Sequence, residues 1–136
     1  MKELPVDHVA IAVHDLEAAV PIYERLTGSR GSRPEAVPSQ HVRVAFVGQI
    51  ELIEPTNDES AVARFLARRG PGLHHIGYRV EDCGAELVRL IAEGFEPIDP
   101  RPRTGAGGHR VAFLDPGTTG GALIELVEHV APDGTG

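Results

Sequence analysis

Four residues of metal-binding types recur in this sequence as two matched pairs. His8 stands in the apolar segment DHVAIAV and His75 in HHIGYRV, while Glu51 and Glu125 stand in IELIE and IELVE. A carboxylate among apolar neighbours is unfavourable unless it is paired or coordinated. Two imidazoles and two carboxylates together suit a divalent transition ion such as Co, Mn, Zn, Ni or Fe. The four residues therefore predict a metal centre that leaves coordination positions for water or substrate.

The pairs match because the chain is an internal repeat. Laid over itself, VDHVAIAVHDLEAAV matches LHHIGYRVEDCGAEL, which places His8 on His75. VRVAF then matches HRVAF, and IELIE matches IELVE, which places Glu51 on Glu125. Self-similarity at a long fixed period indicates copies of one supersecondary unit. If the two copies pack about a pseudo-twofold axis, the four residues converge on one point.

Each copy has the pattern of a strand, a helix and then further strands. DHVAIAV and HHIGYRV are β-branched, alternating runs, typical of a strand with one face on a core. Asp15 and Asp82 follow as helix N-caps, and the helical spacing ends at Gly28 and Gly94. Pro21 should remove a hydrogen bond from the first of these helices and bend it.

The segment between the copies predicts a linking helix over residues 57–70. NDESAVARFLARRG begins with good capping residues, carries apolar residues on one face and stops at Gly70. At 136 residues the chain fits a single domain. Within residues 1–136 we place the first unit at 5–56 and the second unit at 71–130.

Strand geometry selects one histidine of the pair His74 and His75. Side chains of a strand alternate between its faces, so Ile76 and the bulky residues two and four positions after it share one side. His75 then lies with Gly77 on the side of small residues, as His8 does with two alanines. A single strand histidine is more often structural than a ligand. Its repetition together with the glutamate favours the metal site, with small residues leaving room for a cleft.

Composition excludes several classes of function. The net charge of −7 disfavours broad binding to nucleic acid or to anionic membranes. One cysteine, Cys83, allows no internal disulfide, and no segment resembles a secretory signal or a membrane span. We therefore expect a cytoplasmic protein with no nucleic-acid and no membrane partner.

These residues resemble the vicinal oxygen chelate superfamily, which includes glyoxalase I, extradiol dioxygenases and the methylmalonyl-CoA epimerases. The epimerases are the nearest resemblance, through DHVAIAV, EPTNDESAVARFLARRGPGLHHIGYRV and PRTGAGGHRVAFLDPGTTGGALIELVE, which cover nearly the whole chain. The resemblance implies an α+β fold of two tandem βαβββ units that form a curved sheet around a metal cleft. It also implies, by position, the metal ligands His8, Glu51, His75 and Glu125.

The resemblance further implies inversion at C2 of methylmalonyl-CoA through a metal-stabilised enolate. The cofactor would be a divalent ion, cobalt first, with manganese, zinc or nickel as alternatives. Glu125 is expected to be ligand and base on one face of C2, and Glu51 or a bound water to serve the other. The small-molecule partner would be an acyl-CoA, and the assembly a homodimer.

Coenzyme A is anionic and the chain is acidic, so arginines should gather near the cleft mouth. The candidates are Arg68, Arg69, Arg101, Arg103 and Arg110. The segment RTGAGGHR offers backbone N–H groups that could close over the substrate, or it is simply a hairpin turn. The predicted substrate-binding residues are Arg103, Gly105, Gly107 and Gly108.

The chain departs from the epimerases in two segments. Asp115 begins the segment DPGT, where members often have HPKS, so a lysine contact is missing. Some members carry a second acid-base glutamate on the strand at 42–46, where VRVAF has no carboxylate. The alternatives are a glyoxalase I-like lyase acting on a glutathione hemithioacetal and a non-catalytic binding protein of the same fold. An extradiol dioxygenase is disfavoured because it would use only one carboxylate ligand.

Overall fold

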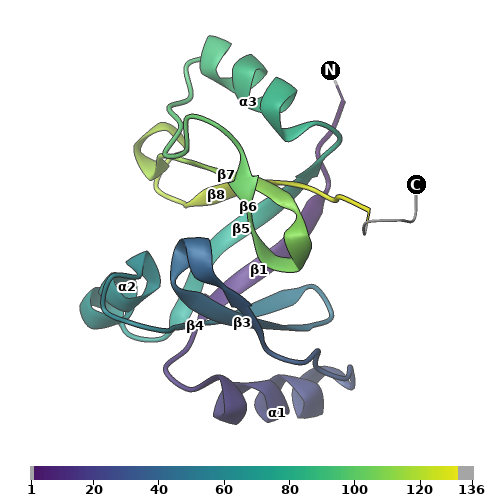
Figure 1. The fold of residues 1–136 in the computed structure, drawn as a ribbon, viewed down its shortest axis with the longest axis vertical. Coiled ribbons are helices and arrows are strands. Elements are labelled where there is room, and N and C mark those ends of the chain that lie inside the picture. The colour runs from purple at the N-terminus through teal and green to yellow at the C-terminus, as the bar shows by residue number, and fades with distance from the viewer. Residues whose placement is uncertain (1, 132–136) are drawn as a thin grey trace. The chain divides into compact units, whose positions relative to one another are not determined.

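The chain folds as two compact units, each with a four-stranded sheet and a helix along one side (Figure 1). The structure is a computed structural model that describes residues 2–131. The first unit is His8–His74, and the second joins the residues up to Asp7 with those from His75 onward.

The first unit has the order strand, helix and three strands. Its sheet runs in the order β2-β3-β4-β1, with β4 parallel to β1 and antiparallel to β3. A second helix, α2, follows the sheet strands and carries the chain toward the second unit. The elements are β1 (Val6–Ala12), α1 (Leu16–Thr27), β2 (Glu35–Val37), the 3-10 turn Pro38–Gln40, β3 (Val42–Val47), β4 (Ile50–Pro55) and α2 (Ala61–Arg69).

The second unit repeats this plan. Its sheet runs in the order β5-β8-β7-β6, with β8 parallel to β5 and antiparallel to β7. The elements are β5 (Gly72–Val80), α3 (Cys83–Ala92), β6 (Arg103–Thr104), β7 (Arg110–Leu114) and β8 (Ile124–Glu128), with short 3-10 turns at Ala106–Gly108 and Pro116–Thr118. The βαβββ pattern expected of both copies is therefore present in each.

The helix boundaries follow the capping residues. The Asp15 carboxylate accepts a hydrogen bond from the Ala18 amide, and Asp82 does the same for Ala85. The first helix ends at Gly28, whose φ of 76° is the left-handed conformation that glycine adopts without strain. The helix α1 continues through Pro21. In the described part of the chain, no helix is both long and apolar enough to cross a bilayer.

Each helix packs on one face of its own sheet and leaves the other face for the histidine and glutamate. Leu16 and Ala19 of α1 pack with Leu52 of β4, and Leu87 of α3 packs with Leu126 of β8. Figure 1 shows α1 along the strands of the first unit and α3 along those of the second. In the second core, burial raises the pKa of the Cys83 thiol to about 11, so the thiol stays protonated.

A glutamate at the end of the last strand fastens the helix in each unit. Glu54 accepts a hydrogen bond from the Leu16 amide at 2.9 Å, and Glu128 accepts one from the Cys83 amide at 2.8 Å. Each amide belongs to the first residue of its helix, where N–H groups have no partner within the helix. We call these two contacts the helix anchors. They also place a negative charge at the positive end of the helix dipole.

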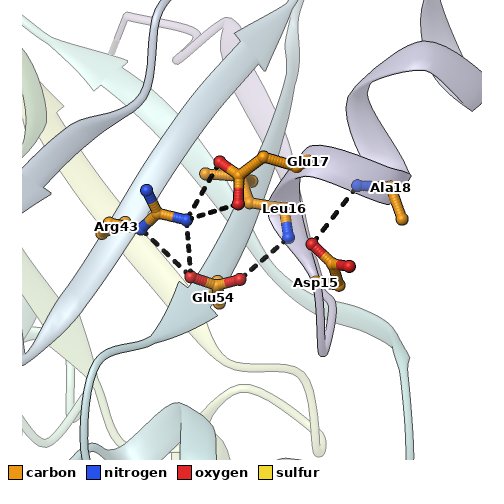
Figure 2. A network of polar contacts seen from close by, with 6 residues as sticks. All are labelled: Asp15, Leu16, Glu17, Ala18, Arg43 and Glu54. Atoms are coloured by element: carbon orange, nitrogen blue, oxygen red, sulfur yellow. Dashed lines mark hydrogen bonds and ion pairs between the residues drawn. The ribbon is translucent and has the colours of Figure 1, made fainter.

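An arginine on the neighbouring strand completes the anchor of the first unit (Figure 2). The Arg43 guanidinium contacts Glu54 at 2.9 Å and Glu17 at 2.8 Å. Hydrogen bonds to Glu17 and then Glu54 raise the pKa of Arg43, which keeps it charged. In the second unit Arg110 lies 3.9 Å from Glu128. The anchor is thus a repeated feature, like the histidine and glutamate.

Replacing Glu54 with glutamine is expected to lower the free energy of unfolding by about 1–2 kcal/mol, because the hydrogen bond to the Leu16 amide loses its charge. The Glu54 side chain is 17% exposed, so water replaces little of that loss. Glu17→Gln is the matched control: Glu17 meets the same arginine but is 62% exposed, and should cost less than about 0.5 kcal/mol. Urea unfolding of both variants measures the difference, and equal losses would contradict a specific role for the anchor.

Candidate metal site

In the first unit, His8 and Glu51 form a buried pair. His8 lies on β1 and Glu51 on β4, where Glu51 is opposite Ala10, so both side chains share the face away from α1. The His8 Nε2 and Glu51 Oε1 atoms are 3.3 Å apart, and the two residues are 5% and 6% exposed. The Phe46 ring lies opposite Glu51 on β3 and meets the His8 ring edge to face, with centroids 6.0 Å apart.

The second unit holds the equivalent pair, His75 and Glu125. Glu125 of β8 is opposite Gly77 of β5, and its Oε1 lies 3.0 Å from His75 Nε2. Both residues are buried. Phe113 stands opposite Glu125 and meets the His75 ring edge to face at 5.1 Å. Each unit therefore brings one imidazole, one carboxylate and one aromatic ring to the face that its helix leaves uncovered.

His74 lies on the other side of the strand. Its ring meets Phe65 of α2 edge to face, with centroids 5.0 Å apart. The structure thus places His75 beside a buried carboxylate, and His74 against an apolar helix residue. His74 has the surroundings of a packing residue.

The donor atoms of each pair fit a divalent metal ion. The atoms that face one another are an imidazole nitrogen and a carboxylate oxygen, the common ligands of zinc, cobalt and manganese in proteins. Both pairs are buried, and a buried carboxylate needs a cationic or hydrogen-bonding partner. Each unit thus supplies two ligand-type side chains from adjacent strands.

The first unit also contains a cluster of three acidic residues, which ion pairs and hydrogen bonds explain without a metal ion. Asp15, Glu17 and Glu54 bring carboxylate oxygens within 4.8 Å of one another. Arg43 binds two of these carboxylates, and Asp15 and Glu54 accept amide hydrogen bonds from α1 (Figure 2). The cluster belongs to the helix anchor.

Arg103 lies on the same face as His75 and Glu125. In β6 it is opposite Val111, which stands two residues before Phe113 on β7. The Arg103 guanidinium lies 5.9 Å from the centroid of the Phe113 ring and its Nε lies 3.3 Å from Asp99. A cation is thereby placed beside the aromatic ring that packs on His75.

The glycine-rich segment after Arg103 is a tight turn between β6 and β7. Gly105 donates its amide to the His109 carbonyl at 2.8 Å, and Gly107 and Gly108 have φ values of 68° and 76°. A side chain on Gly107 would come within 3.2 Å of the His109 ring. The turn thus depends on glycine at these positions, and binding of substrate by Arg103, Gly105, Gly107 and Gly108 stays a prediction.

Arg110 lies on a different face of the sheet from these residues, and its contact with coenzyme A stays a prediction. It stands opposite Glu128 on the face of the sheet that α3 covers. Because neighbours along a strand point to opposite sides, Arg110 and Val111 face apart. Arg68 and Arg69 are exposed on α2, where Arg69 lies 5.8 Å from the Phe65 ring centroid.

Phe46 and Phe113 were not among the site residues predicted from the sequence. The repeat contained the signal, because VRVAF and HRVAF align the two phenylalanines as strictly as the histidines. In the structure both rings stand opposite the glutamate of their unit. They form the apolar surroundings of each His–Glu pair.

Comparison with known proteins identifies the family. The Glyoxalase/Bleomycin resistance protein/Dioxygenase superfamily matches residues 7–113. The ethylmalonyl-CoA/methylmalonyl-CoA epimerase of Cereibacter sphaeroides is 40% identical over 126 residues, covering 88% of this chain and 94% of its own. The crystal structure of methylmalonyl-CoA epimerase from Mycobacterium tuberculosis matches with a TM-score of 0.89 and 34% identity, covering 93% of this chain and 89% of its own. The chain belongs to the methylmalonyl-CoA epimerase family.

These matches to a family of isomerases confirm the resemblance and the fold class that it implied. A variant of the Streptomyces coelicolor methylmalonyl-CoA epimerase, in complex with 2-nitronate-propionyl-CoA, matches with a TM-score of 0.89 and 35% identity, covering 95% of this chain and 100% of its own. The strand β3, Val42–Val47, has the sequence VRVAFV and carries no carboxylate.

Proposed function

We propose that this protein inverts C2 of methylmalonyl-CoA with a divalent metal ion held by His8, Glu51, His75 and Glu125. The observation that carries the proposal is the buried His–Glu pair, which occurs at equivalent strand positions in both units. Relatives with 33–40% identity that are named as epimerases of this substrate support it. The proposal brings the two pairs together around one ion.

When bound to these four residues, a divalent ion would supply electrophilic stabilisation of the negative charge that develops when C2 loses its proton. Cobalt is our first choice, with manganese, zinc and nickel as alternatives. Nitrogen and oxygen donors accept all four metals, and the donor set alone favours none of them strongly.

The chain's own residues move the proton. C2 lies between a thioester and a carboxylate, and the carboxylate charge opposes formation of a second anion. Glu125 is our choice for the base on one face of C2, because its buried carboxylate stands beside His75 on the face that α3 leaves uncovered. Phe46 and Phe113 keep water away from both His–Glu pairs, which strengthens the electrostatic interactions there.

Arg103 and the turn at Gly105–Gly108 are proposed to bind the charged part of the acyl group. Arg103 lies on the His75 face and carries a charge that matches a carboxylate or phosphate. The glycines of the turn carry no side chains, so an acyl group can approach the backbone there closely. Location in the cytoplasm and assembly as a homodimer stay predictions.

Proton NMR of methylmalonyl-CoA in D2O tests the proposed function. Metal-stripped protein is expected to leave C2 unlabelled, and added Co(II) is expected to start deuterium entry at C2 together with inversion. Failure of Co, Mn, Zn and Ni alike, in protein shown to be folded by circular dichroism, would contradict it. Turnover of the glutathione hemithioacetal of methylglyoxal by the same samples would instead favour the lyase.

A further inference from the structure

Inversion of a carbon centre needs two proton carriers. One group removes the proton from one face of C2, and a second group must return a proton to the opposite face. Glu125 belongs to the second unit, and the strands of the first unit carry the candidates for its counterpart. Glu51 is proposed here only as a metal ligand, so a further carboxylate is needed for this step.

The strand register singles out Glu35. Glu51 of β4 is opposite Phe46 of β3, and Val44, two residues before Phe46, is opposite Glu35 of β2. Residues directly opposite each other share a face, as do alternate residues of one strand. Glu35 therefore lies on the same face as Glu51.

No other strand residue of the first unit competes for this role. On the strands β1–β4, the acidic residues are Asp7, Glu35, Glu51 and Glu54. Asp7 directly precedes His8, so it faces the other side of the sheet, and it contacts His129 at 2.6 Å. Glu54 is opposite Arg43 and accepts the Leu16 amide, so it points to the α1 side. Glu35 is thus the remaining carboxylate of the face that carries His8 and Glu51.

The separation of Glu35 and Glu51 suits a substrate between them. Strands lie about 4.8 Å apart and rise about 3.4 Å per residue, which puts the two Cα atoms about 12 Å apart. Two carboxylates at that distance could serve opposite sides of a small acyl group. Val44 and Phe46 are the β3 residues between them on this face, and Val44 is buried.

Exposure to water distinguishes Glu35 further. Glu35 is exposed at the edge strand β2, whereas Glu51 is 6% exposed. A proton carrier must recover its starting state between turnovers, and an exposed carboxyl group exchanges its proton with water directly.

We propose that Glu35 is the second acid-base residue of the inversion, and this rests on the proposed function. Glu125 takes the C2 proton as the C–H bond breaks and its electron pair passes into the thioester. The Glu35 carboxylic acid then gives its proton to the opposite face, where that electron pair forms the new C–H bond. Glu125 is left protonated and Glu35 ionised, which is the starting state for the reverse inversion. Proton exchange of both groups with water restores the forward state.

The test uses full-length Co(II)-loaded Glu35→Gln and each pure C2 epimer in D2O. Glutamine keeps the size of the side chain but has no acidic proton to donate. Inversion is expected to fall by about 10²–10⁴-fold in both directions. For the epimer whose proton faces Glu125, deuterium should still enter C2 with retained configuration. Glu35→Asp should recover part of the inversion, and Glu93→Gln, an exposed change at the end of α3, should match wild type.

Each other result has a separate meaning. If wild type exchanges C2 and Glu35→Gln inverts within about twofold of wild type, the role of Glu35 is refuted while the proposed function stands. If folded Glu35→Gln loses exchange from both epimers, Glu35 acts in binding and the acid-base role is refuted. If wild type itself exchanges neither epimer with any of the four metals, the proposed function fails, and this inference fails with it.

Discussion

Replacing His75 with alanine is expected to remove cobalt binding and C2 exchange together. The change deletes one of four proposed ligands and leaves the Glu125 carboxylate without its imidazole neighbour at 3.0 Å. Loss of a partner that merely orients a ligand already costs about 10–100-fold in metal affinity, so deletion of the ligand should cost at least about 100-fold. Isothermal titration with Co(II) measures the affinity, and deuterium entry at C2 measures the chemistry.

His74→Ala is the matched control, because it removes the adjacent imidazole from the same strand. His74 packs against Phe65, so the variant is expected to unfold somewhat more easily but to bind cobalt and exchange C2 as wild type does. Equal loss of cobalt in both variants would mean that the strand, and not the His75 side chain, is what the ion requires.

Glu125→Gln is expected to slow inversion by about 10²–10⁴-fold, because the amide accepts no proton from C2. Glutamine retains an oxygen that can contact a metal ion, so cobalt binding should fall less than in His75→Ala. When Glu125→Gln is incubated with each pure epimer in D2O, deuterium should enter only one of them. That epimer should be the one that does not exchange with Glu35→Gln.

If each of the two variants keeps deuterium exchange from a different epimer, Glu35 and Glu125 act on opposite faces of C2. Full inversion by Glu125→Gln with cobalt bound would show that Glu125 is not the base. Loss of exchange from both epimers, in protein without cobalt, would show only the ligand role, and the base would then have to be another group.

The positions of the histidines and glutamates could be predicted because a repeat supplies its own comparison. A single histidine in a β-branched strand, such as His8, does not by itself indicate a metal ligand. Its repetition at His75, followed in both copies by a glutamate, does indicate one. The two-residue period of a strand then fixed the faces. The same period places Arg110 on the side away from Phe113, since Arg110 alternates with Val111.

Glu35 could not be predicted because its position depends on register. The strand β2 has only three residues, Glu35–Val37, too few for alternation to be recognised. Its place opposite Val44 is set by hydrogen bonding between strands, which leaves no local trace in the sequence. The repeat gave no help, since the second copy has the two-residue strand Arg103–Thr104 in the equivalent place.

The helix anchors have a consequence for how this protein can change. Each closing strand carries its site glutamate and its anchor glutamate three residues apart, and an odd spacing turns them to opposite faces. A single short strand thus separates the residues that govern stability from those that govern chemistry. Substitutions on the substrate side of one copy leave the helix anchor on the other side intact. A duplicated unit of this kind therefore tolerates divergence of activity without loss of its ability to fold.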